Sequence, residues 1–212
     1  MGQQCRSLSA EPQQQRQRTP VNRTRIINIP SLLLFRQGPR RGKHVTSSHP
    51  ATWEAKQLLA ACDSKRQRRS GPGGQHRNKV ETAVILTHRT SQIQGQASER
   101  RSQEENRQVA LFRLRLNLAL GIRSDKQPTG PSELWQQRCP AKRISIRATH
   151  KDFPVLLAEV LDFCQATGGD LKSVAEQLQT TTSQLIRFLK LEARAFQLLN
   201  QLRAENQLHP LK

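Results

Sequence analysis

The sequence predicts an α+β fold, with a short β-sheet packed by a long helix and then an all-helical C-terminal unit. Two β-rich runs at 83–87 and 93–97, a capped apolar helix after Ser102, and helical apolar patterns from 151 onward carry this prediction. The expected divisions are a disordered basic arm or leader over 1–48, a sheet-and-helix domain over 49–123, a linker over 124–150 and the helical unit over 151–212.

The two β-rich runs are separated by residues that can turn, so we expect a hairpin. In the helix that follows, Ser102 can cap the first turn, Glu105 stands three residues later as in a capping box, and Gly121 suits the C-terminal end. Apolar residues recur at helical spacing at Val109, Phe112, Leu116 and Leu120, with Ala110, Leu114 and Leu118 beside them. This helix should cover the hairpin.

Further helices are expected before and after this domain. An apolar stripe and an early proline predict a helix over 50–62. The C-terminal helices are expected over 153–166, 171–178, 183–190 and 192–205. The segment 171–190 resembles a helix-turn-helix, although Gln179 stands where a turn glycine is common. A plain αα-hairpin in a small helical bundle is the alternative.

Charge is distributed unevenly along the chain. The chain has 35 Lys and Arg against 16 Asp and Glu, which gives a net charge of +19 and a pI of about 11.3. The whole excess of positive charge lies before residue 151. A field of this sign concentrates polyanions, so nucleic acid or an anionic surface is expected and a cationic small molecule is not. Because 151–212 is electrically balanced, that unit is not expected to bind DNA strongly alone.

Several functional classes are disfavoured by composition. The longest apolar runs fall far short of the roughly 20 residues that a membrane helix needs. The cysteines at 5, 62, 139 and 164 lie far apart without metal-ligand spacing, so we expect reduced thiols, no metal and no cofactor, with a disulfide scaffold as the alternative. We expect a cytoplasmic monomer, or a mitochondrial protein if the Arg-rich N-terminus is a transit peptide.

The residues best suited to take part in chemistry lie at 71–75, directly after a basic stretch at 65–69. Gly71, Pro72, Gly73 and Gly74 exclude a regular element, and adjacent glycines let bare backbone enter a slot too narrow for a Cβ. Gln75 is neutral, so it can orient a water molecule, and its backbone N–H can stabilise an oxyanion. Such a loop is suited to completing an active site that another molecule supplies.

Basic side chains flank this loop in the sequence and recur before the long helix. They are Lys65, Arg66, Arg68, Arg69, Arg77, Lys79, Arg100 and Arg101. Clustered cations of this kind neutralise phosphates, so a nucleic acid is the expected surface against which the loop acts.

The segment 69–84, RSGPGGQHRNKVETAV, closely resembles the signature of class I peptide chain release factors, and the resemblance continues through 86–88 and 99–103. It covers about 62–123. The resemblance implies a domain that enters the peptidyl transferase centre of the large ribosomal subunit. There the Gly-Gly-Gln loop would promote attack by water on the ester that joins the nascent peptide to the tRNA.

The resemblance also implies roles for individual residues. Gly73 and Gly74 would provide the backbone path, and Gln75 would exclude nucleophiles other than water and place its N–H at the ester. A glutamine methyltransferase would modify the Gln75 side chain. Residues that would brace the loop or contact ribosomal RNA are Ser70, His76, Arg77, Asn78 and Lys79. His76 is not required as an acid or base.

The resemblance further suggests a subtype. Codon-reading members place a separate codon-reading domain well before the loop, whereas only 72 residues precede Gly73 here. Short members of the family rescue stalled ribosomes without reading a codon, and this is the expected function. The chain departs from them because 191–212 is not a basic tail. Two alternatives stay open: a non-enzymatic RNA-binding or regulatory protein that uses the helix-turn-helix-like unit, and hydrolysis of free peptidyl-tRNA.

Overall fold

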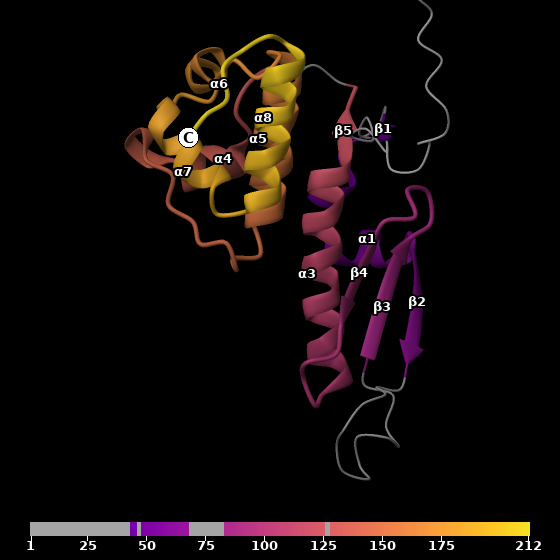
Figure 1. The fold of residues 1–212 in the computed structure, drawn as a ribbon. Helices are drawn as coiled ribbons and strands as arrows, with labels where there is room; N and C mark the ends of the chain where they lie inside the picture. The colour runs from indigo at the N-terminus through magenta and orange to yellow at the C-terminus, as the bar shows by residue number, and fades with distance from the viewer. Residues whose placement is uncertain (1–42, 46–47, 68–82, 126–127) are drawn as a thin grey trace, which may run out of the picture. The chain divides into compact units, whose positions relative to one another are not determined.

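The computed structural model describes residues 43–45, 48–67, 83–125 and 128–212, all within one compact unit, Pro39–Lys212. These residues form a mixed helix-and-sheet structure, as expected (Figure 1). Within the same residues, no helix combines the length and apolar character that crossing a membrane requires.

A three-stranded antiparallel sheet has the order β2 (Cys62–Gln67), β3 (Ala83–His88), β4 (Gln94–Ala97). In β3 the even-numbered residues are buried and the odd-numbered ones are half-buried, the alternation typical of a strand with one covered face. The predicted hairpin is therefore present as β3 and β4. No strand was predicted at β2, because β2 is an exposed edge strand whose charged residues lack apolar alternation.

The long helix α3 (Gln103–Gly121) covers this sheet (Figure 1). The Ser102 side chain accepts a hydrogen bond from the backbone N–H of Glu105 at 3.4 Å, which confirms the predicted N-cap. The buried residues of α3 are Asn106, Ala110, Leu114, Leu118 and Ala119, whereas Val109, Phe112, Leu116 and Leu120 are only half-buried. Gly95 of β4 allows this close packing, because a Cβ there would collide with the backbone of Ala110 and Leu114.

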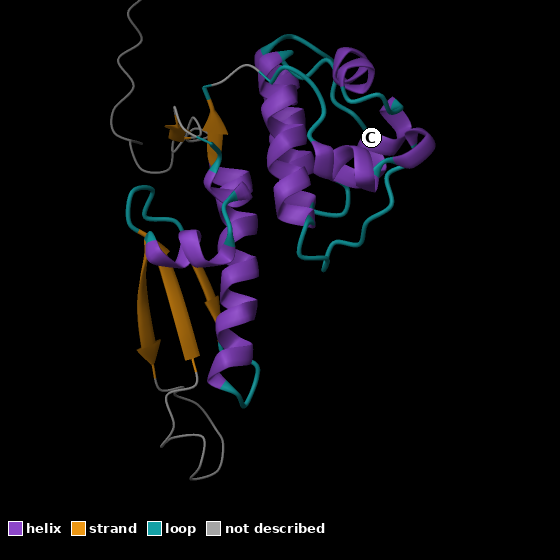
Figure 2. Cartoon of the chain, turned by 180° about the vertical axis from the view of Figure 1, so that it is seen from behind, coloured by secondary structure: helices purple, strands orange, loops and turns teal. Residues whose placement is uncertain are grey.

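The helix expected over 50–62 is divided. A 3-10 turn, η1 (Pro50–Thr52), is followed by α1 (Ala55–Ala60), and β2 begins two residues later. Figure 2, seen from behind, shows α1 across the end of the sheet where β2 begins. A second sheet joins β1 (Lys43–Val45) in parallel to β5 (Ile122–Ser124), directly after α3. Gly121 is the last residue of α3 rather than a residue beyond it.

The segment expected as a linker contains folded structure, which corrects that prediction. It includes α4 (Glu133–Arg138) and the 3-10 turn η2 (Pro140–Lys142). Trp135 of α4 is 1% exposed, and its Nε1 donates a hydrogen bond to the carbonyl of Leu178 at 2.9 Å. The segment therefore supplies a core side chain to the helical region.

Four further helices follow. They are α5 (Phe153–Ala166), α6 (Leu171–Gln177), α7 (Thr182–Leu189) and α8 (Ala193–Glu205). All lie within one residue of their predicted bounds. Gln179, between α6 and α7, has a φ of +53°, so it adopts the left-handed conformation for which glycine is the usual residue.

Candidate RNA-facing site

The Gly-Gly-Gln loop begins and ends on paired strands. Gln67, the last residue of β2, is the register partner of Ala83, the first residue of β3. The predicted site residues at 68–70 and 73–79 lie between these partners and outside the described residues: Arg68, Arg69, Ser70, Gly73, Gly74, Gln75, His76, Arg77, Asn78 and Lys79. Both ends of the segment are therefore anchored by an antiparallel ladder.

The remaining predicted site residues gather at this end of the sheet. Arg66 is exposed on β2 and pairs in register with Val84, which in turn pairs with Ala97 at the end of β4. The chain then enters α3 through the exposed Arg100 and Arg101. Figure 1 shows the start of α3 at the end of the sheet where β2 ends and β3 begins. Arg66 and the adjacent pair Arg100 and Arg101, which are distant in sequence, thus lie at the same end of the sheet.

Asn106 holds the entry to α3 in place. Its side chain is fully buried, accepts a hydrogen bond from the backbone N–H of Arg100 at 2.9 Å and donates one to the Arg100 carbonyl at 2.9 Å. Sequence reasoning missed this residue. A buried amide that satisfies both backbone groups of Arg100 fixes the path by which the chain enters α3.

Arg113 provides a second attachment. Its guanidinium donates to the Gln96 carbonyl at 2.8 Å and pairs with the Glu99 carboxylate at 2.5 Å. Slight burial raises the pKa of Glu99, but the hydrogen bonds from Arg113 and from backbone N–H groups outweigh it and lower that pKa overall. Glu99 therefore stays ionised, and the turn from β4 to α3 is held at both ends.

His88, part of the resemblance, lies at the opposite end of β3, where it pairs with Cys62. It is 2% exposed, its Nδ1 is 2.8 Å from Ser91 Oγ, and its ring meets Trp53 edge-on at 6.0 Å. Burial and the nearby Arg89 charge lower the pKa of His88. His88 is therefore a neutral structural residue that supports the β3–β4 turn.

The described site can bind phosphates, but its side chains do not form a catalytic cluster. Among the described residues, no group of three or more His, Cys, Asp or Glu side chains could hold a metal ion. The described cysteines, Cys62, Cys139 and Cys164, are free thiols, and burial raises the pKa of Cys164 to about 12.

Comparisons with known proteins agree with this arrangement. The family model described as RF-1 domain matches residues 60–151, which includes β2 to β5, α3 and α4. The match extends beyond the 62–123 of the resemblance into the segment expected as a linker. No solved structure matches the chain significantly.

Curated relatives match shorter stretches of the chain. Peptide chain release factor 2 of Acidovorax sp. is 53% identical over 51 residues, 24% of this chain and 14% of that protein. Peptide chain release factor 1 of Dictyoglomus thermophilum is 40% identical over 70 residues, 33% of this chain and 19% of that protein. The matches thus span less than a fifth of these relatives. Residues 60–151 of this chain are therefore similar to the RF-1 domain, and shorter stretches of the chain are similar to peptide chain release factors 1 and 2.

Proposed function

We propose that this protein is a codon-independent peptide release factor that hydrolyses peptidyl-tRNA in the peptidyl transferase centre of stalled ribosomes. The observation that carries the proposal is the sequence Gly73-Gly74-Gln75 inside the RF-1 domain match. This tripeptide lies between two paired strands, and Arg66, Arg100 and Arg101 are exposed at the same edge. Ribosomal RNA phosphates are the natural partners of such cations.

The proposed reaction is ester hydrolysis. Water attacks the acyl carbon that joins the peptide to the tRNA 3′ oxygen, the tetrahedral oxyanion forms, and the tRNA leaves with a restored hydroxyl group. The Gln75 backbone N–H stabilises charge on oxygen in this step, and its side chain orients the water and excludes larger nucleophiles. The two glycines allow the backbone to approach the ester closely. The ribosome supplies the rest of the site.

The test is release of labelled peptide from purified ribosomes stalled on an mRNA that lacks a stop codon. Gln75→Ala keeps the backbone N–H but removes the side chain that orients the water, so release should slow by roughly 100-fold or more, while ribosome binding persists. Gln108→Ala, an exposed glutamine on α3, is the matched control and should release at the wild-type rate. Full release by Gln75→Ala would refute the role assigned to the loop.

Two further arms test the finer parts of the proposal. Ribosomes with a stop codon in the decoding site should be no better a substrate than ribosomes without one, and a strict stop-codon requirement would contradict codon independence. Peptidyl-tRNA without ribosomes should not be hydrolysed. Methylation of Gln75, the second part of the proposal, predicts the mass gain of one methyl group on its peptide, lost when the methyltransferase is absent.

The non-enzymatic alternative is weakened by the surroundings of α7. In a helix-turn-helix, the second helix would read DNA through its exposed N-terminal face. Here the Gln184 side chain on that helix accepts a hydrogen bond from the backbone N–H of Ile144 at 3.3 Å. The Thr180 hydroxyl before the helix donates to the Lys142 carbonyl at 2.9 Å. The segment after η2 therefore covers part of the face that would enter a DNA groove.

A further inference from the structure

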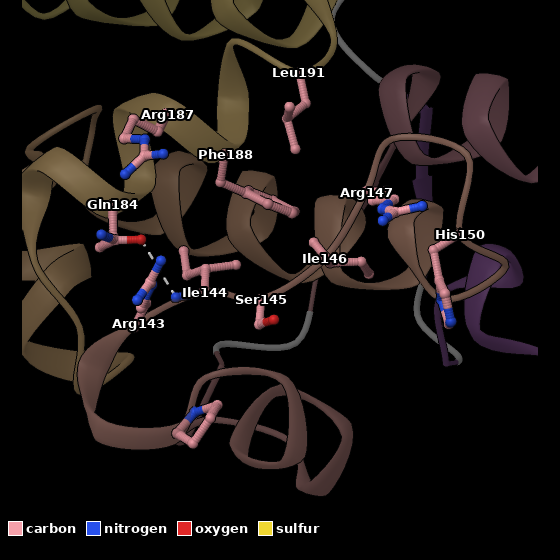
Figure 3. Close-up of a pocket in the computed structure, with 11 residues that line it drawn as sticks. Arg143, Ile144, Ser145, Ile146, Arg147, His150, Gln184, Arg187, Phe188 and Leu191 are labelled. Carbon is pink, nitrogen blue, oxygen red and sulfur yellow. Dashed lines mark hydrogen bonds between the residues drawn. The ribbon is translucent and has the colours of Figure 1, made fainter.

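An open groove of about 750 Å³ lies between α7 and the segment that follows η2 (Figure 3). It is remote in sequence from the Gly-Gly-Gln loop. Its lining consists of basic and apolar side chains with a few neutral polar ones. The residues used below are Arg143, Ile144, Ile146, Arg147, Gln184 and Arg187. Figure 3 shows Arg143 and Arg187 beside Gln184 and shows Arg147 near His150, farther along the groove.

The wall formed by 143–147 is extended and held in place. Its exposure alternates: Arg143, Ser145 and Arg147 are exposed, and Ile144 and Ile146 are half-buried. The backbone N–H of Arg143 donates to the Pro140 carbonyl at 3.0 Å, and that of Ser145 donates to the Arg138 carbonyl at 2.8 Å. Together with the Ile144 bond to Gln184, these contacts present Arg143 and Arg147 from a backbone segment that is held in place.

The groove is cationic although 151–212 is neutral as a whole. Every charged residue between Glu133 and Asp152 is basic, and no Asp or Glu lines the groove. Two acidic residues lie next to lining residues in sequence. Asp152 is paired at 2.6 Å with Arg138, which is not a lining residue, and lies 3.5 Å from Nδ1 of the lining His150; Glu192 is paired at 2.7 Å with Arg194, which is not a lining residue either. None of the ion pairs found among the described residues involves Arg143, Arg147 or Arg187. These three are thus available for an external anion.

The backbone of the extended wall disfavours one class of ligand. A peptide that added a strand to 143–147 would need free N–H groups along the wall. The N–H groups of three successive residues, Arg143, Ile144 and Ser145, are already engaged within the protein. Recognition must therefore use side chains, and guanidinium groups in a row are suited to the repeated phosphates of a nucleic acid strand.

We propose that this groove binds the phosphate backbone of an RNA strand through Arg143, Arg147 and Arg187. The choice of RNA among polyanions rests on the proposed ribosomal function, while the binding itself does not depend on hydrolysis. Phe188, the aromatic residue that lines the groove, is 2% exposed, so bases cannot stack on it. The interaction is therefore electrostatic and independent of base sequence.

The experiment measures binding of a fluorescein-labelled oligouridine to the full chain by anisotropy at several salt concentrations. The test variant is Arg143→Ala/Arg187→Ala, and the control is Arg107→Ala/Lys172→Ala, which removes the same charge from exposed positions outside the groove. All proteins carry Gln75→Ala, so hydrolysis plays no part. The test variant should bind roughly 2- to 30-fold more weakly than the control. Its salt slope should fall by about 1.4, or about 0.7 for each lost phosphate contact.

Two results would overturn the proposal. One is equal loss of affinity in the test and control variants, which would mean that only net charge matters. The other is that polyglutamate displaces the oligouridine as well as unlabelled RNA does at equal charge concentration, and that both competitors lose strength equally in the test variant. That result would indicate an acidic protein as the ligand. Arginine-dependent binding to RNA together with failed peptide release would sink the proposed function but leave the groove assigned.

Discussion

The sheet region, β2 to β4 with α3, and the helical region, α4 to α8, build their cores in different ways. The sheet region packs small and aliphatic side chains against a glycine, so its helix and sheet approach closely. The helical region places large rings at its centre: Phe188 meets Trp135 at 6.0 Å and Phe153 at 5.3 Å. The first leaves one end of the sheet exposed and cationic, whereas the second encloses its rings and carries the cationic groove at its surface.

A buried ion pair connects the two regions. Arg123 of β5 is 7% exposed, and its guanidinium lies 3.2 Å from the Asp162 carboxylate of α5. The same guanidinium donates to the Ala119 and Leu120 carbonyls at 2.6 and 2.9 Å. A buried charge needs such satisfaction, because an unpaired one costs several kcal/mol. The pair therefore specifies how α5 follows the end of α3.

The largest expected effect is on the ring-filled core. Trp135→Ala removes a buried ring and its hydrogen bond to Leu178, so the free energy of unfolding should fall by about 3–5 kcal/mol in urea denaturation. Trp53→Ala is the control, because Trp53 is only half-buried. Equal losses for the two tryptophans would mean that α4 is not part of the helical core.

The glycine contact of the sheet region should be the next most sensitive feature. Gly95→Ala forces β4 away from α3 and should cost about 1–3 kcal/mol of unfolding free energy. A Cβ at Gly130 would meet nothing within 4 Å, so Gly130→Ala should be neutral or slightly stabilising. If Gly95→Ala behaved like Gly130→Ala, the packing of sheet on helix would be looser than described.

A pH effect on stability is expected at the junction of the two regions, where His49 is buried. His49 Nε2 lies 3.2 Å from the Ile122 carbonyl, and its Nδ1 accepts the Ala51 N–H at 3.1 Å, so the ring must be neutral. Burial is the main cause that lowers the pKa of His49; the Arg123 charge also lowers it, while Asp162 and the Ile122 bond raise it.

The sign follows from proton binding. The unfolded imidazole binds a proton more readily than the folded one, so stability is complete above about pH 6.5 and falls as pH drops through the lower folded pKa. His49→Gln should reduce the change in the urea unfolding midpoint between about pH 7 and pH 5. His209→Gln, at an exposed position, should leave that change as it is in the wild type. If the urea midpoint of His49→Gln changed with pH as much as that of the wild type, another group would cause the pH dependence, and His88 would be the next residue to test.

The smallest expected effects are at the helix caps, where the two regions should behave alike. Ser102 caps α3, and Thr181 caps α7 by accepting the Gln184 N–H at 3.2 Å. Each Ala substitution should lower the unfolding free energy by about 1 kcal/mol. A much larger loss at Ser102 would indicate that the start of α3 also supports the edge that carries Arg100 and Arg101.

Local sequence patterns were sufficient for the elements that they encode directly. The hairpin, the Ser102 cap and the C-terminal helices follow from alternation, capping and helical spacing. Strand β2 was missed because an exposed edge strand has no apolar alternation, and β1 with β5 because their pairing joins residues far apart. Helix α4 lies among prolines and glycines, and its place in the core depends on a tryptophan whose partner, Leu178, is distant in sequence.

The candidate site also combines features that the local sequence encodes with features that depend on distant residues. The Gly-Gly-Gln segment and its flanking cations were found from sequence, because their chemistry lies in consecutive residues. The position of Arg100 and Arg101 at the end of β2 and β3 depends on strand register and on Asn106. Neither can be predicted from a short sequence motif. The cationic groove combines 143–147 with α7, so it exists only in the folded chain.

The most direct test of the central claim follows the oxygen atom of the attacking water. Stalled ribosomes with peptidyl-tRNA would be treated with this protein in heavy-oxygen water, and the released peptide examined by mass spectrometry. The account predicts one heavy oxygen in the new C-terminal carboxylate, none in the tRNA 3′ hydroxyl, and loss of labelled peptide with Gln75→Ala. Labelled peptide that forms equally fast with Gln75→Ala, or release without incorporation of the label, would contradict it.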